Sequence, residues 1–225
     1  MAEQHAEGSR TWQQTKSAMT RDAILTAALD CIYEHGYAHT TTAKIAEQAG
    51  LSRGAMLHHF ANRFDLIRAA IDFLNTQRLE RYAQEEQAVQ SDAEATKIDA
   101  GIDVYWRQLN TRHFTVLLEL RVASRTDPEL RAVLEPALLA FEEQAARVTR
   151  QLFPDLARSQ AFQRAILLTH YLLEGMAIAR ATDPRPIPET LLLDWLKSEL
   201  RESFQDVQRP QDPDADHAPP PADPL

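Results

Sequence analysis

Small, hydroxyl-bearing and cationic residues gather in one short stretch of the sequence, from Thr41 to Phe60. Gly50 can form a sharp turn there, and Ser52 can cap the next helix because its hydroxyl accepts a backbone N–H. That helix would start with Arg53, followed by glycine and alanine, so its backbone could approach a phosphate or the edge of a base. The pattern predicts a helix-turn-helix, whose second helix enters the major groove of DNA with its N-terminal end toward the bases.

The charge pattern favours a nucleic-acid partner for this part of the chain only. Residues 10–63 carry a formal charge of +2, whereas the whole chain of 225 residues carries −9. An acidic chain argues against a general nucleic-acid binder. A charge that differs between parts of a chain is instead a hint that one part alone has such a partner.

The other reactive residues form neither an active site nor a metal site. His58 and His59 are neighbours on a helix, so they point about 100° apart and cannot hold one ion together. The histidines form no set with a nucleophile and an orienting group, and glycine-rich phosphate loops are absent. Cys31 is the single cysteine, which excludes an internal disulfide, and it falls on an apolar helix stripe. We therefore expect no enzymatic activity, no metal and no cofactor.

Helices must position these residues, because the composition favours no other element. The chain has only six glycines, and its abundant alanine, leucine, glutamate, glutamine and arginine are strong helix formers. No apolar run approaches the ~18 residues of a membrane span, and the N-terminus lacks the apolar segment of a secretory signal. The sequence thus predicts a soluble, cytoplasmic, all-α protein with no membrane partner.

Periodicity, caps and prolines predict about nine helices. The first ends at Gly36, where a positive φ is needed, and two short helices follow at 43–48 and 53–59. Asn62 would cap a fourth, longer helix. Pro136 should kink or split the helix that contains it. Further helices are expected near residues 94–110, 113–125, 128–152, 158–181 and 188–205.

The two ends of the chain differ from this helical pattern. Residues 1–17 are polar and aperiodic, and residues 207–225 are rich in proline and aspartate, so both segments are predicted to be disordered. Between them, residues 18–66 would form the helix-turn-helix domain. Residues 67–206 would form a helical body, which the long fourth helix joins to that domain.

The stretch around the turn resembles the TetR-type family of helix-turn-helix transcriptional regulators. The resemblance covers about residues 19–67; the rest of the chain resembles the family only in helix content, length and order. Where the family usually has leucine and tyrosine, this chain has Met56 and Leu57, and Leu57 could meet a thymine methyl group or belong to the core. The family pattern is matched at Thr41, Ile45, Ala46, Ala49, Gly50, Ser52, Gly54, His59 and Phe60, with Leu51 a conservative change and Arg63 near a lysine position.

The resemblance implies that the protein binds a double-stranded DNA operator as a homodimer and responds to a small-molecule effector. A repressor that an apolar or amphipathic effector releases from a near-palindromic operator is favoured, with an activator of the same family as the alternative. A helical adaptor without DNA binding would also explain the bundle, but not the pattern from Thr41 to Phe60. The residues expected to contact DNA are Thr41, Thr42, Lys44, Ser52, Arg53, Gly54, Ala55, Leu57, His58 and Arg63.

Two further sets of residues lie in the predicted body. Polar and aromatic groups on otherwise apolar helices could line an effector cavity or lie in the core and at its rim. These are Tyr105, Trp106, His113, Phe114, Arg121, His170 and Glu174. Apolar faces on the last two long helices could close a dimer as a four-helix bundle, or pack within one protomer. These faces contain Phe162, Ile166, Thr169, Leu173, Met176, Leu192, Trp195, Leu196 and Leu200.

Overall fold

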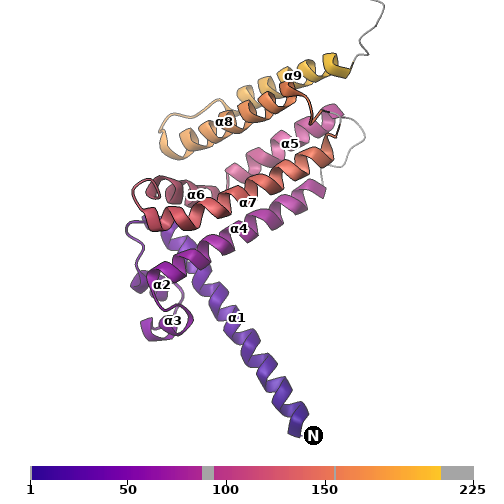
Figure 1. Cartoon of the computed structure of the whole chain (residues 1–225). Coiled ribbons are helices and arrows are strands. Elements are labelled where there is room, and N and C mark those ends of the chain that lie inside the picture. Colours follow the sequence, from indigo (N-terminus) through magenta and orange to yellow (C-terminus); the bar gives the residue numbers. More distant parts are fainter. Residues whose placement is uncertain (1, 88–93, 155, 209–225) are drawn as a thin grey trace, which may run out of the picture.

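The computed structural model describes residues 2–87, 94–154 and 156–208, and every regular element in these ranges is an α-helix (Figure 1). The all-α prediction is confirmed, and the nine helices of the described ranges agree with the expected number. They are α1 (Ala2–His35), α2 (Thr42–Gln48), α3 (Arg53–His59), α4 (Arg63–Gln87), α5 (Glu94–Leu109), α6 (Arg112–Ala123), α7 (Pro128–Leu152), α8 (Gln160–Thr182) and α9 (Glu189–Gln208). None of these described helices is both long and apolar enough to cross a membrane.

The N-terminus differs from the expectation of an irregular arm at residues 1–17. α1 begins at Ala2, so residues 2–17 continue the first helix and extend past the rest of the molecule (Figure 1). Alanine, glutamate and glutamine favour a helix, each added residue gains a backbone hydrogen bond, and no proline precedes Pro128. Of the tail at 207–225, the first two residues end α9, and residues 209–225 lie outside the described residues.

Caps and glycines set the bounds of the short helices as predicted. The Thr41 and Ser52 hydroxyls accept backbone N–H groups three residues later, at 3.3 and 3.1 Å. Asn62 does the same for α4 through its Oδ1 atom, at 2.9 Å. Gly36 and Gly50 have φ of +76° and +66°, a region that favours glycine. The local signals are therefore sufficient to place α2, α3 and the start of α4.

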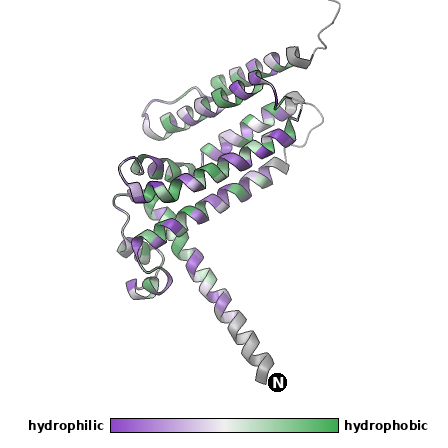
Figure 2. Ribbon diagram, viewed as in Figure 1, coloured by the Kyte–Doolittle hydropathy of each residue, from purple (hydrophilic) through white to green (hydrophobic). Residues whose placement is uncertain are grey.

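Two clusters of buried side chains hold the helices together. The second cluster joins α5, α8 and α9, where Trp106, Leu173 and Leu196 are buried. The first cluster joins α1, α2, α3, α4, α6 and α7, and it includes the buried Cys31. Its fully buried large side chains are Ile24, Ile32, Ile45, Met56, Leu66, Ile71, Leu74, Leu120, Leu130 and Leu134. Figure 2 shows hydrophobic residues concentrated where α1 meets α2 and α6.

The first cluster crosses the predicted domain boundary at residue 66. Leu66, Ile71 and Leu74 of α4 pack together with α1 on one side of the boundary and with Leu120 of α6 on the other. Burial of this kind stabilises by about 25 cal/mol per Å² of apolar surface removed from water. The helix-turn-helix and the near part of the body therefore share one hydrophobic core.

Pro136 does not split its helix, because α7 runs unbroken from Pro128 to Leu152. Proline lacks the N–H that would bond the carbonyl four residues earlier, which here belongs to Ala132. Both residues are exposed, so water can bond to the carbonyl that proline leaves free. An exposed position thus lowers the cost of proline inside the helix.

Candidate nucleic-acid interface and body cavity

The turn between α2 and α3 packs on a few buried apolar side chains. Ile45 and Ala46 of α2 and Met56 of α3 are all buried. A backbone hydrogen bond from the Leu51 N–H to the Ala46 carbonyl, at 2.9 Å, ties the turn to α2. The positive φ of Gly50 reverses the chain there, a conformation that costs other residues roughly 1–2 kcal/mol. The turn therefore fixes the direction in which α3 is presented.

The outer side of this helix pair faces solvent. Arg53, Gly54, Leu57 and His58 are exposed on α3, and we call these four residues the α3 face. Lys44 is exposed on α2. In the described ranges neither Lys44 nor Arg53 forms an ion pair within the protein. Both cations are therefore available to an anionic partner.

Four other predicted contact residues lie around the α3 face. Thr41 and Ser52 are exposed, although their hydroxyls already cap α2 and α3. Thr42 and Ala55 are half-buried beside them. Nine of the ten residues predicted to contact DNA are thus exposed or partly exposed on these two helices and their caps.

Arg63 is the tenth, and its guanidinium is used within the protein. Its Nη1 and Nη2 atoms donate to the hydroxyl and carbonyl oxygens of Tyr37, at 3.2 and 3.1 Å. Its Nε atom donates to the Thr40 carbonyl at 3.2 Å, and the guanidinium lies 4.4 Å from the Tyr37 ring centre. These bonds tie α4 to the segment between α1 and α2. The expected phosphate contact from Arg63 would require breaking them.

The same segment is also bonded to the body. The Tyr37 N–H donates to Glu119 Oε1 of α6 at 2.9 Å, and the Tyr37 hydroxyl donates to Asp127 at 3.2 Å. A side chain at Gly36 would bring its Cβ within 2.9 Å of the Glu119 carboxylate. The segment that leads into α2 is therefore in direct contact with α6 and with the N-cap of α7.

Five of the seven residues predicted to line an effector cavity come together in the body. Tyr105, Phe114, Arg121, His170 and Glu174 line one partly open cavity of about 70 Å³ among α4, α5, α6, α7 and α8. Their spacing in the sequence reaches 69 residues, so no local pattern brings them together.

The polar members of this cavity form a connected chain. The Tyr105 hydroxyl lies 2.6 Å from His170 Nδ1, and His170 Nε2 lies 3.5 Å from Glu174 Oε1. A proton on Nε2 is favoured by the facing carboxylate, so Nδ1 accepts the hydrogen bond from Tyr105. Arg121 Nη1 donates to both oxygens of Glu174, at 3.1 and 3.2 Å. Burial raises the pKa of Tyr105, which keeps the hydroxyl protonated as this donor.

Seven residues of the cavity lining were not predicted from the sequence, among them Arg78 of α4, Gln108 of α5 and Phe141 of α7. The Arg78 guanidinium lies over the Phe141 ring, 3.8 Å from its centre. Helical spacing could have identified Arg78, because it follows the buried Ile71 and Leu74 on one face of α4.

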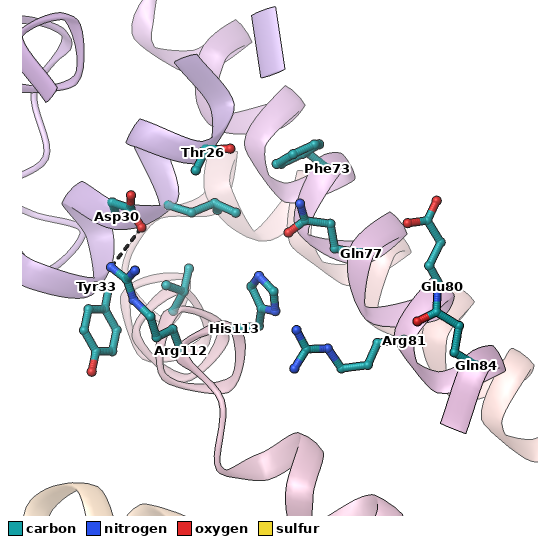
Figure 3. Close-up of a pocket in the computed structure, with 12 residues that line it drawn as sticks. Thr26, Asp30, Tyr33, Phe73, Gln77, Glu80, Arg81, Gln84, Arg112 and His113 are labelled. Atoms are coloured by element: carbon teal, nitrogen blue, oxygen red, sulfur yellow. Dashed lines mark ion pairs between the residues drawn. The ribbon is translucent and has the colours of Figure 1, made fainter. Parts of the chain in front are cut away.

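His113 lies apart from the cavity, in an open groove of about 420 Å³ between α1, α4 and α6 (Figure 3). Figure 3 shows Arg81 of α4 and His113 of α6 facing this groove, and Arg112 bonded to Asp30 at 2.8 Å. Burial and the nearby Arg81 lower the pKa of His113, so the imidazole is neutral near pH 7. Trp106 lines neither space, because its bulky ring is buried in the second cluster.

The residues predicted at a dimer interface are divided between the inside and the outside of the protomer. Ile166 and Trp195 are exposed, and Thr169 and Leu192 are half-buried. The other five, Phe162, Leu173, Met176, Leu196 and Leu200, are buried in the second cluster within the protomer, which was the alternative to a place at the interface. The reason is that α8 and α9 turn one apolar face onto α5. The hydrophobic residues left exposed on them are Ile166, Leu167, Leu168, Tyr171, Leu191 and Trp195.

Comparison with known proteins identifies relatives of both parts of the chain. The profile of the family described as bacterial regulatory proteins, tetR family, matches residues 24–70. An uncharacterized HTH-type transcriptional regulator of Mycobacterium tuberculosis (strain H37Rv) is 29% identical over 183 residues, covering 79% of this chain and 90% of that protein. The HTH-type transcriptional repressor AcnR of Corynebacterium diphtheriae is 29% identical over 145 residues, covering 60% of this chain and 70% of AcnR.

The likeness of fold extends beyond residues 24–70. The crystal structure of a Rhodococcus sp. protein assigned to the TetR family has a TM-score of 0.61 to this chain, at 21% identity. The match covers 85% of this chain and 100% of that one. The helical body and the helix-turn-helix therefore occur together in one known fold.

Proposed function

Because the chain belongs to the tetR family of helix-turn-helix transcriptional regulators, we propose that it is a ligand-responsive repressor that binds a near-palindromic operator as a homodimer. The α3 face carries this proposal. The exposed Arg53 and the small Gly54 lie at the start of α3, which packs on the buried residues of the turn. This arrangement allows close approach to the edges of DNA bases in a major groove. A helical adaptor would have no need of this arrangement.

Two copies of the α3 face are needed to read a near-palindrome. Adjacent major grooves on one side of DNA are about 34–36 Å apart, and a two-fold dimer can present its recognition helices at that spacing. The exposed apolar residues of α8 and α9 support dimer formation, since Tyr171 and Leu191 are 68% and 69% exposed. Large exposed apolar side chains that gather on neighbouring helices are typical of protein interfaces.

An effector in the body cavity would act on the helix-turn-helix through α6. Phe114 and Arg121 of α6 line the cavity, and Glu119 of the same helix accepts the Tyr37 N–H. A shift of α6 on effector binding would therefore move the segment that leads into α2. A change in the spacing of the two α3 helices would then lower operator affinity, with a coupling of typically ~1–3 kcal/mol. The repressor sense of the response is supported by the relative AcnR, which is a repressor.

A gel-shift experiment tests the proposal. The full-length protein is incubated with DNA from upstream of its own gene, and with the same DNA scrambled, at several salt concentrations. We expect tighter binding to the upstream DNA and a single complex of one dimer per site. Equal affinity for both DNAs at every salt concentration would contradict the proposal, and light scattering at ~25 kDa would contradict the dimer.

A further inference from the structure

The body cavity holds a guanidinium with no carboxylate partner. Arg78 reaches the cavity from α4, yet among the described residues no aspartate or glutamate lies within ion-pair distance of it. Its guanidinium lies against the face of the Phe141 ring. Burial lowers the pKa of Arg78 to about 10, so the guanidinium is still charged near pH 7. Arg78 is half-buried, and a charge that is largely removed from water without a partner is stabilised by a counter-ion.

The carboxylate nearest to this charge is already used. Both oxygens of Glu174 accept from Arg121, and one of them also faces His170. Glu142, the other acidic residue of the cavity lining, is exposed to solvent. Glu174 attracts the Arg78 guanidinium through space, but no acidic side chain of the cavity lining forms an ion pair with it.

A second donor in the cavity also lacks a partner. The amide nitrogen of Gln108 is buried and makes no hydrogen bond. An unsatisfied buried donor costs roughly 1–3 kcal/mol, so a ligand that accepts from it gains that amount on binding. The nearby Tyr105 hydroxyl bonds His170 and forms no hydrogen bond with the Gln108 amide. Arg78 and Gln108 thus provide two hydrogen-bond donors in the cavity that have no acceptor among the described residues.

The rest of the cavity wall is apolar. Leu109, Phe114, Leu117, Leu138 and Phe141 surround the two donors. Such walls favour the hydrocarbon part of a ligand, and the donors favour an acid group at one end of it. A carboxylate suits a guanidinium because its two oxygens can accept two parallel hydrogen bonds.

We propose that the effector of this protein is a small organic acid, whose carboxylate binds Arg78 and the Gln108 amide while its hydrophobic part packs against Phe114, Leu138 and Phe141. Acid binding at this site stands by itself, whereas its effect on DNA rests on the proposed function. The open groove at Arg81 and His113, between α1, α4 and α6, is a separate space and plays no part in it.

The binding test uses acids matched with neutral amides. Acetate, propionate and butyrate, small acids in keeping with a cavity of about 70 Å³, are compared with acetamide, propionamide and butanamide at equal ionic strength, by thermal shift and calorimetry on the full chain. We expect at least one acid to raise the melting temperature and to bind at least tenfold more tightly than its amide. If no acid binds better than its amide, the proposal is wrong.

Variants on α4 separate the site from general charge effects. Arg78→Gln should weaken acid binding by about 10- to 100-fold, as expected for the loss of a charge-assisted hydrogen bond. Arg81→Gln is the matched control, because Arg81 lies on the same helix but faces the groove, and it should leave binding unchanged. Equal loss in both variants would contradict the proposal.

A second variant tests the proposal by a gain of acid binding, so the test does not depend on whether Arg78→Gln folds. Glu174→Gln removes the carboxylate that neutralises Arg121, so a second guanidinium becomes available in the cavity. Acid binding should become tighter, whereas a merely structural role of these residues predicts no gain. Unchanged or weaker acid binding in a folded Glu174→Gln protein would count against the proposal.

The effect on DNA distinguishes this inference from the proposed function. If the acid binds through Arg78 and weakens operator binding, both stand. If the acid binds through Arg78 and operator affinity does not change, the acid site stands and the effector role falls. If the protein binds its operator but no acid, the acid site falls and the DNA-binding function stands.

Discussion

The α3 face and the body cavity are built in opposite ways. The hydrogen bonds that position the α3 face are local, since the Thr41 and Ser52 hydroxyls each accept from a backbone N–H three residues later. The bonds in the cavity join residues 53 and 65 positions apart. A surface made by caps and turns can be recognised in a short sequence. A cavity made by packing cannot, because each of its residues looks like an isolated polar group on an apolar helix.

The two regions nevertheless share a core. Residues of α1, α2 and α3 are buried together with residues of α6 and α7 in the first cluster. The Glu119 and Asp127 carboxylates bond Tyr37 across the same junction. Local caps and turns therefore set the conformation of the helix-turn-helix, whereas the shared core stabilises it. Mutations can separate these two contributions.

The largest expected effect comes from the shared core. Leu120 is fully buried where α6 meets α1 and α4, and Leu120→Ala should lower the free energy of unfolding by roughly 2–5 kcal/mol. Chemical denaturation measures this change, and hydrogen exchange should become faster in α2 and α3 as well as in α6. Leu139→Ala on α7 is the control, because Leu139 is 63% exposed and its loss should change stability by under about 0.5 kcal/mol. Faster exchange confined to α6 would break the idea of a shared core.

The next effect concerns the α3 face alone. Arg53→Ala should cost about 1–3 kcal/mol per half-site in operator binding, if the arginine reads a base. Its stability should stay within about 0.5 kcal/mol of the parent, because the side chain is exposed. Fluorescence anisotropy on operator and scrambled DNA measures the difference.

Lys44→Ala is the comparison for Arg53→Ala. A lysine that contacts phosphate should weaken binding to every DNA sequence, and its loss should reduce the log–log salt slope by roughly 2 per dimer. A sequence-specific loss in Lys44→Ala, or a uniform loss in Arg53→Ala, would reverse the roles given to these two cations.

A smaller effect compares caps in the two regions. Ser52 caps α3 at 3.1 Å and Ser159 caps α8 at 3.5 Å, so Ser52→Ala and Ser159→Ala should each cost about 0.5–2 kcal/mol of stability. Only Ser52→Ala should also weaken operator binding, since α3 carries exposed residues predicted to contact DNA and α8 does not. Denaturation and anisotropy on both variants test this, and a matching loss of DNA affinity in Ser159→Ala would remove the distinction.

The smallest effect appears at alkaline pH. Burial raises the pKa of Tyr105 above its ordinary value of 10.0, so the folded protein retains a proton that the unfolded chain releases. The stabilisation is fully present below pH 10 and is lost as the pH rises above it, at about 1.4 kcal/mol per pH unit. Tyr105→Phe should therefore lose less stability between pH 9 and 11 than the parent, by on the order of 1 kcal/mol at pH 11. Denaturation curves at several pH values measure this slope. Parallel profiles would mean that the hydroxyl is not buried in solution.

The outcome for single residues follows the same division between local and packed structure. Arg63 matches the family pattern near a lysine position, but its guanidinium bonds Tyr37 and Thr40 instead of facing outward. Phe162, Leu173 and Leu196 are apolar as a dimer interface requires, but they are buried within the protomer. In each case packing within the protomer determines which partner the side chain has.

The sequence by itself determined the helices, their caps and the α3 face, because each depends on hydrogen bonds and backbone angles within a few residues. Ser52, Gly50 and Asn62 need only their neighbours to act. Only the tertiary structure decided that Arg78 and Gln108 line one cavity, and that Tyr105 bonds His170. Those contacts depend on how α4, α5 and α8 pack, and that packing minimises exposed apolar surface over the whole chain.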